Sequence, residues 1–180
     1  YAESISIGKS LSLLGENVAT TIIESSGSVV VWIVAVSNVT FSGFTVRNSF
    51  DGIYVGYSSN ISISGNIVAG HFRYGIFIDH SSNSRVSRNI ITENIRAIGL
   101  CIGSSSNNNV SENNIVDNNC GILLSSSSDN SLFGNNITNN SVGVYPHSSS
   151  NNVIYHNNFA NSYMQVLISG STSVWDDGYP

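Results

Sequence analysis

Residues 104–140 read SSSNNNVSENNIVDNNCGILLSSSSDNSLFGNNITNN, and this stretch decides the fold. A glycine followed by an aliphatic residue stands at Gly121-Ile122, and the same pair stands 22 residues earlier at Gly99-Leu100. Repetition at a fixed period of this length is typical of solenoid proteins, in which each coil packs only on its neighbours. Members of the series lie 22 to 24 residues apart, at Gly52, Gly75, Gly99, Gly121 and Gly143.

The spacing inside each repeat is stricter than its length. An apolar residue follows eleven positions after each glycine position, and a second follows five positions later. Length varies only in the segment before the next glycine, which is how an exposed turn behaves. The first apolar column contains Phe41, Ile63, Val86, Val110, Leu132 and Ile154, and the second contains Val46, Val68, Ile91, Ile115, Ile137 and Phe159.

This pattern predicts a right-handed, single-stranded parallel β-helix with about six or seven coils of 22–24 residues. Short apolar pairs separated by one residue are strand-like, and a coil supplies the long connection that parallel strands need. We expect one domain over residues 1–180, cut from a longer protein. It would comprise an irregular first coil (1–29), regular coils (30–168) and a terminal segment (169–180), with Asp176 and Asp177 in a turn.

Predicted core positions follow from the register. The glycine strand should bury Val31, Ile53, Ile76, Leu100, Ile122, Val144 and Val166 in one column, and Ile33, Val55, Ile78, Ile102, Leu124 and Ile168 in another. Pro146 falls in this second column, and because proline cannot donate to a ladder we expect a bulge there. Stacked asparagine ladders are predicted at the turns, at Asn66, Asn89, Asn113, Asn135 and Asn157 and at Asn60, Asn83, Asn107, Asp129 and Asn151.

Composition excludes several classes of function. About a third of the residues are Ser or Asn, 41% are hydrophobic, only 9% are charged, and the net charge is −5. The few basic residues form no run, which excludes a nucleic-acid footprint, and no apolar stretch is long enough for a membrane span. Cys101 and Cys120 are one coil and three residues apart in this register, so we expect free thiols.

Candidate chemistry is sparse. The four histidines, at positions 71, 80, 147 and 156, fall in different columns or distant coils, so we expect no metal site and no cofactor. No group of carboxylates suited to polysaccharide cleavage converges, although Asp79 and His147 share a column three coils apart. Arg88 and Glu112 are neighbours in successive coils and should form an exposed ion pair.

The quoted run resembles the parallel β-helix (PbH1) repeats of NosD-like proteins, which are grouped with carbohydrate-binding and sugar-hydrolase β-helix domains. The opening YAESISIGKSLSLLGEN and the closing NVIYHNNFANSYMQVLISGSTSVWDDGYP are similar to the same family, notably to its archaeal surface and secreted members. The resemblance implies an extracellular or cell-surface protein. The family's copper association is not carried over, because the ligands do not converge.

One outward column is the candidate binding face. Its members are apolar or aromatic in a chain whose other outer positions are rich in Ser and Asn, and such patches are seldom left bare. They are Trp32, Tyr54, Phe77, Cys101, Leu123, Tyr145 and Leu167. Leu and Cys offer no ring face, so a protein contact ranks ahead of glycan stacking.

Three functions remain open at this point. We expect a non-catalytic structural or binding module rather than an enzyme, with another protein chain, a second copy of itself or a polysaccharide as partner. The alternatives are a polysaccharide lyase or hydrolase domain, and a self-assembling fibre subunit whose coils pair end to end or face to face.

Overall fold

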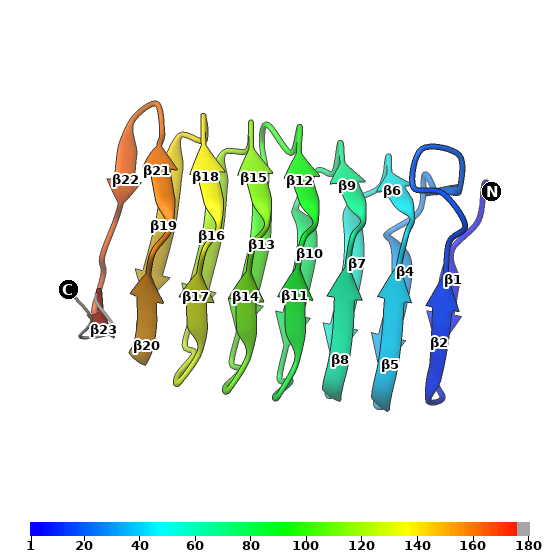
Figure 1. The fold of residues 1–180 in the computed structure, drawn as a ribbon, viewed down its shortest axis with the longest axis horizontal. Coiled ribbons are helices and arrows are strands. Elements are labelled where there is room, and N and C mark those ends of the chain that lie inside the picture. Colours follow the sequence, from blue (N-terminus) through cyan, green and yellow to red (C-terminus); the bar gives the residue numbers. More distant parts are fainter. Residues whose placement is uncertain (176–180) are drawn as a thin grey trace.

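A computed structural model describes residues 1–175, and within that range the chain consists of strands, turns and bends without any helix. The strands form three parallel sheets that wrap around a common interior (Figure 1). No helix capable of crossing a membrane is therefore present among residues 1–175.

The first sheet carries the glycine repeat, and it is the sheet on which the candidate binding face lies. Its eight strands are stacked in chain order. They are β1 (Ile5–Ile7), β4 (Val29–Val34), β7 (Asp51–Gly56), β10 (Tyr74–Asp79), β13 (Ile98–Gly103), β16 (Cys120–Ser125), β19 (Val142–His147) and β22 (Met164–Val166).

The other two sheets each take one of the later apolar columns. The second sheet contains β2 (Leu11–Leu14), β5 (Ser37–Ser42), β8 (Ser59–Ser64), β11 (Arg85–Ser87), β14 (Asn109–Ser111), β17 (Ser131–Phe133), β20 (Ser150–Tyr155) and β23 (Thr172–Val174). The third sheet contains β3 (Ile22–Glu24), β6 (Thr45–Arg47), β9 (Ile67–Ala69), β12 (Ile90–Thr92), β15 (Asn114–Val116), β18 (Asn136–Thr138) and β21 (Asn158–Ala160).

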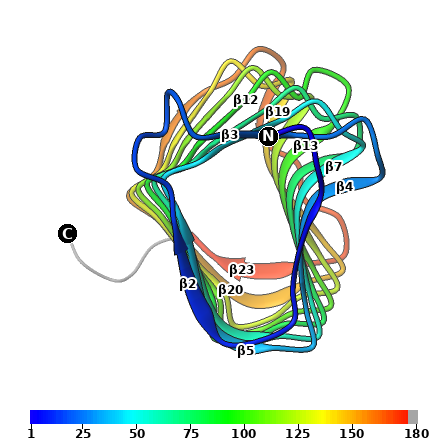
Figure 2. The same ribbon diagram turned by 90° about the vertical axis from the view of Figure 1, so that its right-hand side faces the viewer.

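The molecule is a parallel β-helix, as predicted. Viewed from the N-terminal end, the chain runs clockwise from the first sheet to the second and third while it recedes, which makes the coil right-handed (Figure 2). It has about eight turns rather than six or seven, because the segments before residue 30 and after residue 160 also contribute paired strands. Asp176 and Asp177 lie outside the described residues.

The predicted interior is confirmed for nearly every member. Between the ends of the coil the four columns are buried, and central residues such as Ile122 are 0% exposed. Departures occur at the last coil, where Val166 and Phe159 are only half-buried and Ile168 is 53% exposed. Ile168 was predicted to be internal and is not, because it belongs to the last coil of the first sheet, on which no further described coil packs.

The expected bulge at Pro146 is also absent. Leu124 pairs with Pro146, and Ser125 pairs with His147, without a break in register. The carbonyl of Pro146 accepts from the amide of Ser169, on the side of the last coil. In a parallel strand the amide that proline lacks would face the same side, so one hydrogen bond toward the last coil is lost, while pairing with β16 keeps the register.

Asparagine ladders hold the corners. The predicted ladder from Asn66 to Asn157 is confirmed, since each amide donates to the side-chain oxygen of the next coil, as in Asn89 to Asn113 at 3.0 Å. The second predicted column has the left-handed backbone expected of turn asparagines, but its amides do not form a ladder. That ladder lies one residue later, at Asn108, Asn130 and Asn152.

A further ladder was not anticipated from the sequence. It runs along the turn between the third and first sheets, from Asn94 through Asn118 and Asn140 to Asn161. His71 occupies the preceding coil of this ladder, and its Nε2 lies 3.2 Å from the carbonyl of Val46. The ring nitrogen thus takes the place of the asparagine amides, which bond the equivalent carbonyls in later coils.

Candidate functional site

Strand pairing brings the predicted outward column into a single register. Trp32 pairs with Tyr54 and Tyr54 with Phe77, and the series continues through Cys101 and Leu123 to Tyr145. Leu167 follows directly after β22. The column is not uniform, however, because Cys101 is only 2% exposed whereas Trp32, Tyr54 and Phe77 are half-buried.

An aromatic shelf occupies the N-terminal half of this face, over β4, β7 and β10; we define it as Trp32, Tyr54, Tyr74 and Phe77. The ring centroids of Trp32 and Tyr54 are 5.1 Å apart, and those of Tyr54 and Phe77 are 5.5 Å apart, both edge to face. Tyr74 and Phe77 approach to 4.5 Å. These contacts fix the rings against one another before any ligand arrives.

Two glycines make room for the shelf. A Cβ on Gly56 would lie 2.5 Å from Cε1 of Tyr54, and a Cβ on Gly103 would lie 3.0 Å from Cε2 of Phe77. Both rings therefore occupy space that any side chain at these positions would claim. The glycines stand on either side of Asp79 in the adjacent outward column, so neither of these two positions places a side chain beside the carboxylate.

A hydrogen-bonded group stands beside the shelf. The Tyr54 hydroxyl donates to Oδ2 of Asp79 at 2.9 Å, and Nδ1 of His80 lies 2.8 Å from Oδ1. The His80 ring stacks on Tyr57 with centroids 5.0 Å apart, and Tyr57 is 63% exposed. Burial and the Asp79 carboxylate raise the pKa of Tyr54 to about 12, so its phenol stays protonated at neutral pH.

Arg73 bounds the shelf at its other edge. Its Nε donates to Oδ1 of Asp51 at 2.9 Å, and Nη2 bonds Oδ2 of the same carboxylate. Asp51 is fully buried whereas Arg73 is about half-exposed, and the bidentate pair raises the pKa of the guanidinium. Cζ of Arg73 also lies 5.2 Å from the ring centroids of both Phe50 and Tyr74, within the range of a cation–π contact.

The sequence analysis placed Asp79 correctly in the column of His147, but it missed the group around Asp79 and the Asp51–Arg73 pair. These residues belong to different outward columns and to the turns at their ends, so no single spacing links them. The available signal was the alternation of Gly and Asp at Gly56, Asp79 and Gly103 beside an aromatic column.

Copper ligation does not fit the side chains present. Among residues 1–175 no group of three or more His, Cys, Asp or Glu side chains converges. Cys101 and Cys120 are free, buried thiols as predicted, and burial raises the pKa of both, that of Cys120 to about 12. His71 has both ring nitrogens within hydrogen-bonding distance of Ser49 and Val46. We therefore derive no chemistry through a metal.

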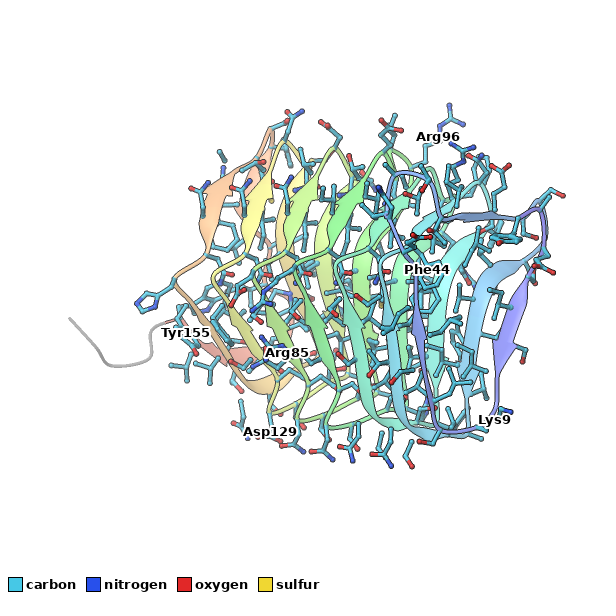
Figure 3. All side chains as sticks on the ribbon, turned by 45° about the vertical axis from the view of Figure 1, so that its right-hand side comes forward. Lys9, Phe44, Arg85, Arg96, Asp129 and Tyr155 are labelled. Atoms are coloured by element: carbon cyan, nitrogen blue, oxygen red, sulfur yellow. The ribbon has the colours of Figure 1, made fainter. Side chains whose placement is uncertain are left out.

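The acidic positions on the turn edge do not make a second site. Glu93 and Asp117 line one hollow beside the exposed Ile95, and Asp117 accepts a hydrogen bond from Asn139. Arg96 projects from the same edge, at the turn before β13 (Figure 3). Elsewhere on the surface, Arg88 and Glu112 form the predicted exposed ion pair, with Nε and Oε2 2.7 Å apart.

The coil and its shelf define a class of protein: an elongated parallel β-helix that carries an aromatic, hydrogen-bonding face on one of its sheets. Within that class, residues 5–179 match the family described as "Periplasmic copper-binding protein (NosD)". The chain belongs to this family. No curated protein sequence matches it.

Several solved structures share the fold. A double mutant of the periplasmic alginate epimerase AlgG aligns over 86% of this chain with 23% identity and a TM-score of 0.75. The mannuronan C-5 epimerase AlgE4 A-module of Azotobacter vinelandii aligns over 93%, with 14% identity and a TM-score of 0.65. An alginate lyase from Paenibacillus aligns over 97%, with 10% identity and a TM-score of 0.61.

Coverage of those structures differs. The chain spans 46% of the AlgG structure and 58% of the AlgE4 module, but 87% of the Paenibacillus lyase. At these identities the likeness establishes the shared β-helix and does not extend to the side chains of a site.

Proposed function

We propose that this chain is a polysaccharide-binding module of an exported protein, and that the aromatic shelf with Asp79 and His80 is its binding face. The observation that carries the proposal is the juxtaposition of fixed aromatic rings with a carboxylate held between two glycines. Sugars are bound in this way, by stacking of their apolar faces on rings and by hydrogen bonds to their hydroxyls. The family's periplasmic description and the polysaccharide enzymes with the same fold support export and a glycan ligand.

The shape of the face suits an extended chain of sugars. Trp32, Tyr54 and Phe77 lie on successive strands, which are about 4.8 Å apart, and this step is comparable to the length of a sugar unit. Phe50 and Tyr57 are exposed just before and just after β7, the middle strand of the three. A polymer lying along the axis of the coil would thus meet one ring per coil.

The chemistry favours binding over cleavage. A general base needs a pKa near the working pH, and the pKa of Tyr54 is raised far above it. The charge of Arg73 is compensated by Asp51, so it is a weak candidate for neutralising a uronate carboxylate during elimination. These features support a module that holds a polysaccharide without breaking it.

A protein partner is the second candidate, and it ranked first on sequence alone. Its basis was the aliphatic half of the column, at Cys101, Leu123 and Leu167. Cys101 is only 2% exposed, because neighbouring side chains of this chain already cover it. A protein partner is therefore not required to bury it. The hydrogen-bonding groups stand beside the aromatic half, which favours a glycan there.

Binding to a panel of soluble polysaccharides, measured by affinity electrophoresis and calorimetry, tests the proposal. The variant Tyr54→Ser/Phe77→Ser should bind at least about tenfold more weakly, since loss of two stacking rings removes more than about 1.4 kcal/mol. The matched control is Phe133→Ser/Tyr155→Ser, which removes a stacked pair from the outer side of the second sheet. Tyr155 of this pair is labelled in Figure 3. Equal binding by both double variants, with the fold intact by circular dichroism, would falsify the proposal.

A further inference from the structure

We infer that the shelf selects neutral polysaccharides over polyuronates, an inference that rests on the proposed function and names the ligand class of the same site. It departs from the alginate-acting enzymes whose fold the chain shares. The argument comes from the charges that a bound polymer would meet on the first sheet.

Cations are scarce on this face. The described strands of the first sheet contain two carboxylates, Asp51 and Asp79, and contain no Lys or Arg. Arg73 directly precedes β10, but it is bound through Nε and Nη2 to the buried Asp51. That pair has no net charge, so Asp79 is the remaining carboxylate of these strands that a ligand would meet. Its basic neighbour is His80, which follows β10 and contacts Oδ1 through Nδ1.

Asp79 is arranged to accept hydrogen bonds from hydroxyls. Its side chain is 19% exposed, and each oxygen has one contact within the protein, with Tyr54 and with His80. A carboxylate offers about four acceptor positions, so about two remain for a ligand. Adjacent hydroxyls of a neutral sugar fit this acceptor pair, and charge-assisted bonds of this kind are among the stronger ones.

His80 extends the same preference. Because its Nδ1 faces Asp79, its Nε2 is directed away from the carboxylate and is available to another hydroxyl. A uronate carboxylate placed over the shelf would instead lie close to Asp79. The two carboxylates would repel each other, and the repulsion is stronger at a partly desolvated surface than in bulk water.

The test compares neutral polymers (a β-glucan, a mannan and a galactan) with alginate and polygalacturonate, using the full chain. We expect the best neutral polymer to bind at least about tenfold more tightly than either polyuronate. Asp79→Asn should weaken that binding by roughly tenfold, the loss expected for a charge-assisted pair. Asp117→Asn is the matched control, because it removes one carboxylate from an exposed turn remote from the shelf.

Salt provides a readout that needs no variant. If Asp79 repels polyuronates, raising the ionic strength should improve their weak binding to the wild-type chain, whereas attraction to Arg73 would make salt weaken it. Tighter wild-type binding to a polyuronate, weakened by salt, overturns the inference while leaving the proposed function in place. Absence of binding to every polymer instead overturns the proposed function, and the inference with it.

Discussion

Nδ2 of Asn113 donates to Oδ1 of Asn135 at 2.9 Å, and both side chains are 1% exposed. The same amide donates to the carbonyl of Val86, and Oδ1 of Asn113 accepts from the backbone and side chain of Asn89. One side chain thus joins its own coil to the coils on both sides of it. The corners of this molecule depend on such bonds because the turns have buried backbone groups that water cannot reach.

Replacing Asn113 by Ala should therefore reduce the free energy of unfolding by about 2–5 kcal/mol, since it leaves buried donors and acceptors unpaired. Chemical denaturation monitored by circular dichroism measures the change. Asn119→Ala is the control at an exposed turn position and should change stability by less than about 0.5 kcal/mol. Similar effects of the two substitutions would show that the ladder does not stabilise the coil.

Ile122 tests the interior in the same way. It is 0% exposed in β16, and truncation to Ala should lower the free energy of unfolding by roughly 2–5 kcal/mol through lost burial and a residual cavity. Ile95→Ala is the matched change on the surface, because Ile95 is 73% exposed. Denaturant midpoints should separate the two variants clearly, and a small effect at Ile122 would contradict the packing described above.

Because His71 is buried, we expect the protein to lose stability as the pH falls. Burial lowers its pKa from 6.5 to about 4, so the unfolded chain binds more protons between these values. Stability from this residue is complete above about pH 6.5 and declines as the pH falls toward 4, by roughly 3 kcal/mol in total.

Asn at position 71 can supply the ladder amide without titrating. His71→Asn should therefore remove this part of the pH dependence, which thermal unfolding of both proteins at several pH values between 4 and 7 would measure. Parallel profiles for wild type and variant would mean that the pKa of His71 is not lowered in the folded protein.

A substitution at Gly56 tests whether this glycine makes room for the Tyr54 ring of the shelf. An alanine Cβ there would overlap the Tyr54 ring, so Gly56→Ala should displace the ring, break the bond from Tyr54 to Asp79 and weaken polysaccharide binding by roughly fivefold or more. Gly8→Ala is the control, because nothing lies within 4 Å of the methyl group that alanine would add there. Tyrosine fluorescence and affinity electrophoresis provide the readouts, and unchanged binding in Gly56→Ala would argue that Tyr54 is not part of the face.

The interior could be predicted from the sequence because its spacing is constant. The steps of eleven and five residues from each glycine position place Ile63, Val86 and Val110 in one column, and burial of these residues follows from register alone. The end of the coil could not be predicted in this way. Ile168 keeps the spacing but loses the strand, since whether a last coil is covered depends on what packs over it rather than on its own pattern.

The site was predicted only in part. The outward column is visible as a run of apolar residues at a fixed position. The group of Asp79 and His80 at one edge of the shelf, and the Arg73–Asp51 pair at the other, depend on ring positions and turn geometry. Tyr54 reaches Asp79 because glycine at position 56 leaves space for its ring. Contacts of this kind depend on side-chain direction, which periodicity does not encode.

The constant interior has a consequence for how such a molecule can change. In every coil the inward residues pack on the interior of the coil, whereas the outward residues contact only their neighbours on the surface, solvent or a ligand. Outward residues can therefore be substituted without changing the packing of the core or the register of the strands. Whole coils can also be added or removed without disturbing those that remain. Specificity and length can vary independently here, so two chains with the same cross-section need share neither a ligand nor a number of turns.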